Sequence, residues 1–127
     1  MSESFAYLIN RLDALLTEMA LKQSAIGALT IASGQVSASG NNTLITPAAG
    51  TRIRVYYASY NPTLAADCAF RFGATGTLWL RNNLTANSVI AKDMGDFRFI
   101  QGAVDEALIL NIVVGVAVNW TCFYILV

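Results

Sequence analysis

The sequence contains no histidine, and only 13% of its residues are charged. Without histidine, the chain lacks the commonest general base and the commonest metal ligand of proteins. Its eight basic residues are balanced by eight acidic ones, with no cluster of Lys and Arg to contact the phosphates of a nucleic acid. Motifs for phosphate binding or nucleophilic catalysis are also missing. These absences predict a protein that is not an enzyme, uses no cofactor or metal, and binds no nucleic acid.

Cysteine is scarce as well, and no export signal accompanies it. Cys68 and Cys122 are the two cysteines, and both fall at inward positions of predicted strands. The N-terminus has no basic region, uninterrupted apolar segment or cleavage site of a secretory signal. We therefore interpret both residues as buried thiols that act as small hydrophobic side chains. A disulfide between them is the alternative.

The low charge content also bears on the surface. A charged fraction of 13% is about half of the ~25% that is usual for a soluble domain, whereas 55% of the residues are hydrophobic. The 127 residues amount to one domain's worth of chain. A single copy of this composition would have difficulty covering itself with solvated groups. We therefore expect partner molecules to cover part of its apolar surface.

Residues 1–26 are predicted to form an amphipathic helix, because apolar residues recur there at helical spacing. In heptads, Phe5, Leu12 and Met19 take position a, Leu8 and Leu15 position d, and Ile9 and Leu16 position e. The helix can fold back on its own domain, or it can form a short bundle with copies of itself. We favour the bundle, and a stripe wider than a and d alone favours three or more helices over two.

Residues 27–127 are predicted to form a separate β-sandwich domain, because the hydrophobic period changes from 3.6 to 2. The predicted strands cover residues 28–32, 35–38, 43–46, 51–60, 66–72, 77–81, 88–91, 96–100, 107–114 and 116–127. Predicted turns include residues 39–42, 73–76 and 82–83. Because the gaps are too short for crossover helices, the pattern indicates an antiparallel sandwich or barrel.

The last two predicted strands are apolar on both faces. One face is expected to meet the core, and the other to pack on a second copy of the chain around a symmetry axis. The second face supplies Ile109, Val113, Phe123 and Ile125 as predicted interface residues, besides Phe5, Leu8, Leu12, Leu15 and Met19 of the helix. Residues 107–127 also contain no charge and meet the length of a membrane helix. Their β-branched and aromatic content and the polar Asn111 and Asn119 favour a closing β-hairpin instead.

Arginine and aromatic residues are expected together on the outer faces of the strands. Arg, Tyr and Trp often anchor protein interfaces, and aromatic rings can also stack on sugars. The residues proposed for partner binding on this basis are Arg52, Arg54, Tyr56, Tyr60 and Trp79. Ordinary decoration of a sheet, in which arginine stems cover apolar area, explains the same pattern.

The whole chain resembles small virion proteins of tailed bacteriophages. The resemblance rests on the short N-terminal amphipathic helix, the segment of residues 50–57 that opens a core strand, and the segment of residues 105–112 that leads into a hydrophobic C-terminal strand. Proteins of this layout are capsid decoration (cement) proteins and head-fibre proteins, usually trimers with a β-jelly roll. The resemblance therefore implies a mainly β fold, an antiparallel jelly-roll-type sandwich preceded by one helix.

The expected function is that of a non-enzymatic structural virion protein, a homotrimer on the capsid surface. Its expected partners are copies of itself and the major capsid protein or another virion protein, with no membrane. The alternative is a tail-associated receptor-binding or carbohydrate-binding jelly roll, or a connector between virion parts.

Overall fold

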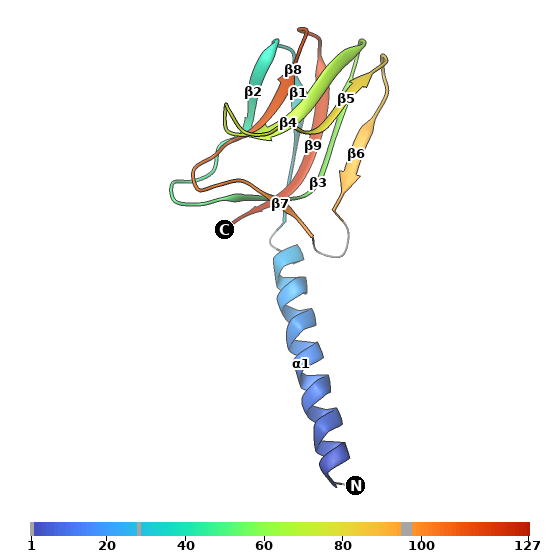
Figure 1. The fold of residues 1–127 in the computed structure, drawn as a ribbon, viewed down its shortest axis with the longest axis vertical. Helices are drawn as coiled ribbons and strands as arrows, with labels where there is room; N and C mark the ends of the chain where they lie inside the picture. Colours follow the sequence, from blue (N-terminus) through green and yellow to red (C-terminus); the bar gives the residue numbers. More distant parts are fainter. Residues whose placement is uncertain (1, 28, 95–97) are drawn as a thin grey trace.

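The protein consists of one long helix that stands away from a two-layered β-sandwich (Figure 1). This computed structural model describes residues 2–27, 29–94 and 98–127, and within the helix it describes the side chains of residues 4–19. Helix α1 spans Ser2–Gly27, which agrees with the predicted helix to within one residue. Gly27 ends it, as expected of a residue that cannot support a helix well.

The strands of the sandwich follow one another with short connections. Their bounds are β1 Thr30–Val36, β2 Gly40–Ile45, β3 Ile53–Pro62, β4 Ala66–Phe72, β5 Trp79–Leu84, β6 Ile90–Asp93, β7 Ile100–Gln101, β8 Leu108–Ile112 and β9 Val118–Leu126. Sheet A has the order β1-β9-β3-β6, with β7 also paired to β3, and sheet B has the order β2-β8-β4-β5. All of the pairs are antiparallel.

The pairing is that of a jelly roll. β1 pairs with β9, β2 with β8, β3 with β6 and β4 with β5, so the chain forms a nested series of antiparallel pairs. Two further pairings, β9 with β3 and β8 with β4, roll this ribbon into two facing sheets. In a jelly roll, the two sheets formed in this way bury one apolar face of each sheet between them. The predicted fold class, a jelly-roll-type sandwich preceded by one helix, is confirmed.

Several local predictions need correction. β1 is one continuous strand where two were predicted, and β2 begins at Gly40, inside the predicted turn of residues 39–42. The Asn82-Asn83 pair lies within β5, so the predicted turn there is wrong as well. Tertiary pairing with β8 and β4 outweighs the turn preference of asparagine at these places. The predicted strand of residues 96–100 begins in residues 95–97, which lie outside the described ranges.

The C-terminal segment also differs from its prediction. β8 and β9 are strands, so the interpretation of residues 107–127 as a membrane helix is wrong. They do not form a hairpin either, because β8 lies in sheet B and β9 in sheet A. Nowhere in residues 2–27, 29–94 and 98–127 is there a helix of the length and apolar character that a bilayer crossing requires.

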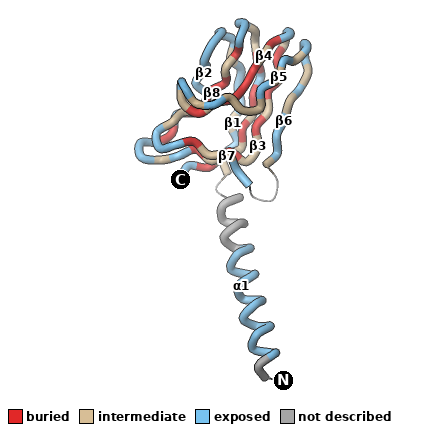
Figure 2. Tube along the Cα trace, in the orientation of Figure 1, coloured by how far each residue is buried: buried red, intermediate tan, exposed pale blue. Residues whose placement is uncertain are grey.

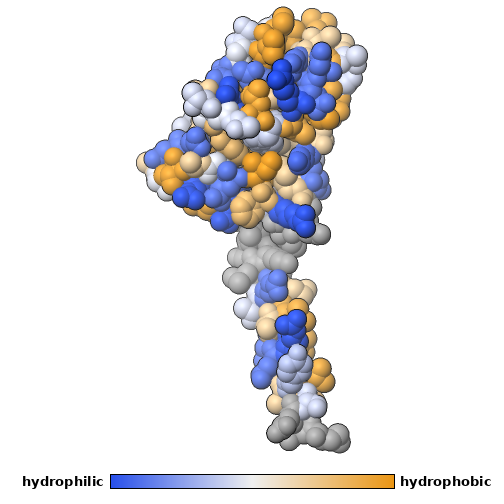
Figure 3. Space-filling model, viewed as in Figure 1, coloured by the Kyte–Doolittle hydropathy of each residue, from blue (hydrophilic) through white to orange (hydrophobic). Residues whose placement is uncertain are grey.

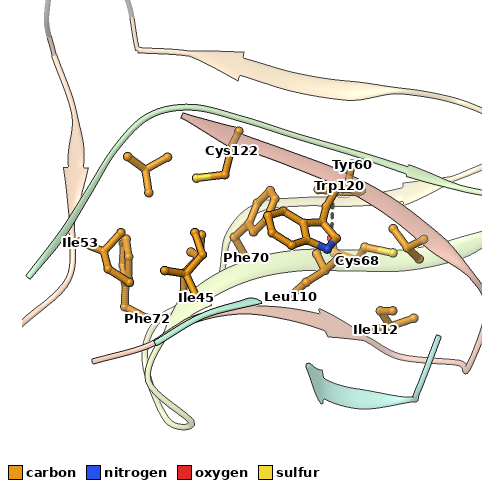
Figure 4. Close-up of a cluster of buried hydrophobic side chains, with 14 of the residues drawn as sticks. Ile45, Ile53, Tyr60, Cys68, Phe70, Phe72, Leu110, Ile112, Trp120 and Cys122 are labelled. Atoms are coloured by element: carbon orange, nitrogen blue, oxygen red, sulfur yellow. Dashed lines mark hydrogen bonds between the residues drawn. The ribbon is translucent and has the colours of Figure 1, made fainter. Parts of the chain in front are cut away.

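The core lies between the two sheets and is wholly apolar among the described residues, since no polar or charged residue is buried there. Its largest fully buried side chains include Tyr60, Phe70, Ile53, Leu108 and Leu110. Figure 4 shows Tyr60, Phe70, Ile53 and Leu110 together with both cysteines between the strands. No described side chain of the helix belongs to this core.

The loops divide into two groups at opposite ends of the sandwich. The loops β1–β2, β3–β4, β5–β6 and β8–β9 meet at the end farthest from α1 (Figure 1). Hydrogen bonds join three of them, from the Thr63 amide to the Ala117 carbonyl at 2.9 Å and from the Asn87 amide to the Pro62 carbonyl at 2.8 Å. We call these four loops the distal loops. The helix and the C-terminus lie at the other end.

Candidate functional site

The helix presents an apolar stripe that nothing in its own subunit covers. Every described side chain from residue 4 to residue 19 is exposed, and Figure 2 shows this along the stalk. The large apolar side chains are 44–67% exposed: Phe5, Tyr7, Leu8, Ile9, Leu12, Leu15, Leu16 and Met19. They include all the predicted a, d and e residues. The alternative of a helix folded back on its own sandwich is therefore wrong.

The outer face of sheet A carries a second apolar feature. Ile31, Phe123 and Tyr57 are neighbours in register on β1, β9 and β3, and we call them the apolar row. The Tyr57 and Phe123 rings lie 4.8 Å apart, whereas Ile31 at the edge is 69% exposed. Directly paired residues of an antiparallel sheet share a face, so the row runs across three strands toward the β1 edge.

The four interface residues predicted on the last two strands do not share one surface. Ile109 is on sheet B and Ile125 on sheet A, and at 5% and 8% exposure both are buried within the single subunit. Neither needs a second copy to cover it, since the neighbours of Ile109 in register, Thr43 and Arg71, flank it on the same face. Val113 is 58% exposed but lies in the distal loops. Phe123 alone belongs to the apolar row.

Tyr60 is placed in the core rather than on an outer face, so that prediction is wrong. A β-bulge between Val55 and Tyr57 adds a residue to β3 and reverses its alternation. The Tyr60 ring is 1% exposed, and its hydroxyl lies 2.8 Å from the Cys68 carbonyl and 2.6 Å from the Leu80 carbonyl, the former contact drawn in Figure 4. One hydroxyl proton can serve either acceptor, so Tyr60 has a structural role.

Trp79 also faces inward. Its ring stacks on Phe70 at 4.9 Å and lies 5.8 Å from Phe72, both of which belong to the core. An exposed ring for stacking on a sugar is therefore absent at Trp79, as it is at Tyr60. The carbohydrate-binding alternative loses the two aromatic residues on which it depended.

Two of the remaining predicted partner-binding residues, Arg54 and Tyr56, contact Phe99. The Arg54 guanidinium lies 4.4 Å from the Phe99 ring centre, and its Nε donates to Gln101 Oε1 at 2.6 Å. Tyr56 meets the same ring edge-on at 5.8 Å. Arg52 is exposed and pairs through its backbone with Val127. Arg54 and Tyr56 thus have intramolecular partners, as ordinary sheet decoration predicts.

The outer face of sheet B is polar, and its side chains form hydrogen bonds and an ion pair within the subunit. Arg71 donates to the Gly76 carbonyl at 2.6 Å, and Asn111 donates to Asn41 at 2.8 Å. Arg81 and Asp67 form an ion pair at 3.0 Å, and this hydrogen-bonded carboxylate raises the pKa of Arg81. A face with this chemistry is suited to water.

The distal loops add exposed apolar side chains that sequence periodicity missed. Leu64, Val89 and Val114 are 61–64% exposed, and none of these loops contains a charged residue. Figure 3 shows apolar surface at this end of the sandwich as well as along the stalk. The sequence signal that could have identified these exposed side chains is the presence of aliphatic residues inside turns, where polar residues are usual.

Both cysteines are buried free thiols, as predicted. Burial raises the pKa of the Cys122 thiol to about 12. Burial, and then the nearby Asp67 carboxylate, raise the pKa of the Cys68 thiol to about 11. At neutral pH both therefore remain protonated and inert, because the thiolate is the reactive form. Within the described part of the chain, no group of His, Cys, Asp and Glu side chains could hold a metal ion.

We expect the protein to lose stability as the pH rises above 9. In the unfolded chain the thiols ionise near their ordinary pKa of 9.0, whereas the folded chain keeps these protons to about pH 11 and 12. The folded state then binds more protons, so the free energy of unfolding falls with a slope of about 0.7 kcal/mol per pH unit for each thiol at pH 9, approaching about 1.4 kcal/mol per pH unit at higher pH. Urea unfolding between about pH 8 and 10 measures the slope, and a Cys122→Ala variant should halve it. Equal stability across this range would contradict the expectation.

Comparisons with known proteins add little to this description. Neither models of protein families nor curated protein sequences match the chain. Among solved structures, it is similar to the cryo-EM structure of a virus-like particle of the extra small virus (XSV) of the giant freshwater prawn Macrobrachium rosenbergii. That match has a TM-score of 0.36 at 10% sequence identity and covers 76% of this chain and 79% of the other. Function must therefore be inferred from this chain's own residues.

Proposed function

We propose that this chain is a non-enzymatic structural protein of a tailed-phage virion, a homotrimer that decorates the capsid or forms a head fibre. The observation that carries the proposal is the exposed apolar stripe of α1 on a helix that stands clear of its own sandwich. Most of the stability of a helix in a protein comes from packing of its apolar face, whereas this helix leaves its described apolar side chains exposed within the subunit. It needs other helices, and its own copies present the same stripe.

Burial of the stripe supplies the energy of assembly. At about 25 cal/mol per Å² of apolar surface, the helical residues gain on the order of ten kcal/mol per subunit before entropy costs. Apolar residues at a, d and e make the stripe wide enough for three helices, each facing two neighbours. A parallel bundle of this kind places the three sandwiches together at one end.

The distal loops supply the contact with the rest of the virion. They point away from the bundle, carry no charge and expose Leu64, Val89, Val113 and Val114. An apolar surface without charges fits an apolar patch on the major capsid protein or another virion protein, because burying an unpaired charge would be costly. Three such tips on one trimer would multiply a weak contact through avidity.

The proposal is tested by the mass of the purified chain and by its binding to particles. Light scattering should give the mass of three chains, and the protein should co-sediment with capsids of the phage that encodes it. A Val114→Asp variant should keep the trimeric mass and lose co-sedimentation, because it places a charge in the distal loops. The mass of a single chain would overturn the trimer. A trimer that does not bind capsids would overturn the virion role alone.

A further inference from the structure

We propose that the sandwich domains of neighbouring subunits pack on one another through the β1 side of sheet A, that is, the apolar row and the β1 edge. The occupant of this surface is a second copy of the chain. The inference rests on the homotrimer proposed above, and it identifies which face of each sandwich is directed toward the axis.

The covalent connection between α1 and β1 is short. Ile31 follows Gly27, the last residue of α1, by four residues, which can span at most about 14 Å. In a bundle with helices about 8–10 Å apart, each helix axis lies about 5–6 Å from the three-fold axis. Each copy of Ile31 must therefore lie within about 20 Å of that axis. No other strand of the sandwich is connected to the bundle by so few residues.

The β1 side of the sandwich comes from a segment of the chain without charges. No charged residue occurs between Lys22 at the end of the helix and Arg52, a segment that includes all of β1 and β2. The apolar row continues the hydrophobic character of the helix onto sheet A. Beyond it on β1 and β9, toward the distal loops, the outer face is polar but uncharged, with Gln35 hydrogen-bonded to Asn119 across the β1–β9 pair. The charge on this face that is in register with the row, Asp93 beside Tyr57, lies at the β6 edge. Removing water from a surface without charges costs less free energy than removing it from a charged one.

The edge of sheet A that β1 forms lacks the usual protection of an edge strand. In the described ranges β1 pairs with β9 on one side only, so its other side offers unpaired backbone groups. Natural edge strands of this length are usually protected by charged residues or proline. The β1 sequence TIASGQV contains neither. Packing against a neighbouring subunit would cover an edge that the chain leaves unprotected.

The other faces of the sandwich differ in each respect. At the opposite edge, β6 carries Lys92 and Asp93, and β5 carries Arg81 in its ion pair with Asp67. The outer face of sheet B forms its own hydrogen bonds, from the Arg71 side chain to the Gly76 carbonyl and from the Asn111 side chain to that of Asn41. These surfaces are suited to solvent. The β2 edge of sheet B is also free of charge and proline, but among the described faces the β1 side combines such an edge with the exposed apolar row. The β1 side therefore favours burial against a copy of the chain most.

The consequence is a trimer held at two levels. The apolar stripe of the helix covers only about two and a half heptads, and most of the stability of a helix in a protein comes from packing of its apolar face. A contact between sandwiches directly above the bundle would add apolar area and restrict rotation of the sandwiches relative to the bundle. The row and the stripe would then act as one continuous interface.

Protection of an introduced thiol tests the contact. In the full chain, Ile31→Cys and Leu64→Cys place a cysteine at positions that are 69% and 62% exposed in a single subunit. The native Cys68 and Cys122 are buried and contribute no background. With a maleimide as probe, we expect the cysteine at position 31 to react at least about tenfold more slowly than the one at position 64. Adding Leu12→Asp to Ile31→Cys should restore fast labelling.

The masses of the same samples separate the two proposals. If light scattering shows a trimer and the cysteine at position 31 reacts as fast as the one at position 64, the sheet A contact is wrong and the helical trimer stands. If the unmodified chain has the mass of one subunit, both are wrong. Slow labelling that persists in a Leu12→Asp sample with the mass of one subunit would mean that the chain protects residue 31 within one subunit, which also overturns the contact.

Discussion

Replacing Leu12 by aspartate is expected to reduce the light-scattering mass of the protein from that of three chains to that of one. Leu12 is at the centre of the helical stripe and is 56% exposed in the single subunit. In the proposed bundle, three copies of this residue form one layer. The change removes about 1.5–3 kcal/mol of burial per side chain and places three carboxylates in an apolar seam, where each costs several kcal/mol of desolvation.

The matched control is Thr17→Asp, which adds the same charge on the opposite side of the same helix. Thr17 takes heptad position f and is exposed, and threonine and aspartate have similar helix propensities. We expect this variant to keep the trimeric mass. An unchanged mass for Leu12→Asp would remove the bundle, and loss of the trimer in both variants would mean that any added charge disrupts the helix.

The second large effect is expected in the core. Replacing Phe70 by alanine should lower the free energy of unfolding by about 3–5 kcal/mol, a large part of the 5–15 kcal/mol typical of a folded protein. Phe70 is 0% exposed, and its ring meets Tyr60 at 5.5 Å and stacks on Trp79 at 4.9 Å. Both neighbours would border the cavity. Urea unfolding at fixed protein concentration measures the loss.

Phe99→Ala removes the same atoms from a ring that is 42% exposed and serves as the control. This ring contacts Arg54 and Tyr56 at the surface, so we expect a loss of about 1 kcal/mol or less. Equal losses in the two variants would contradict the view that the sandwich depends on its two-sheet core. Because no described side chain of the helix belongs to that core, the Phe70 variant should have a less stable sandwich without any direct change in the helical stripe.

Local periodicity was sufficient to predict the helix. The apolar residues from Phe5 to Met19 repeat at helical spacing, and their exposure in the structure agrees with an interface that a single subunit does not provide. The switch to period 2 after residue 27 likewise predicted the β domain. Both patterns are properties of consecutive residues, so the sequence contains them in full.

The faces of individual residues were less predictable. Alternation along β3 places Tyr60 outside if counted from Ile53, but the bulge at Tyr56 inserts one residue and turns it inside. Asparagines expected in turns are in β2 and β5, because their partners in β8 and β4 satisfy the backbone. Bulges and register depend on the neighbouring strand, which a single segment does not specify.

Sequence alone determined the composition of each surface: an apolar helical stripe, a charge-free segment between Lys22 and Arg52, and strands of apolar and polar alternation. Only the tertiary structure decided where those surfaces lie. It buried Ile109 and Ile125 within the subunit, grouped Leu64 with Val114 at the distal end, and aligned Ile31 with Phe123 beside the helix. The physical reason is that side-chain chemistry is encoded residue by residue, whereas adjacency in a jelly roll arises from pairings between strands far apart in the chain.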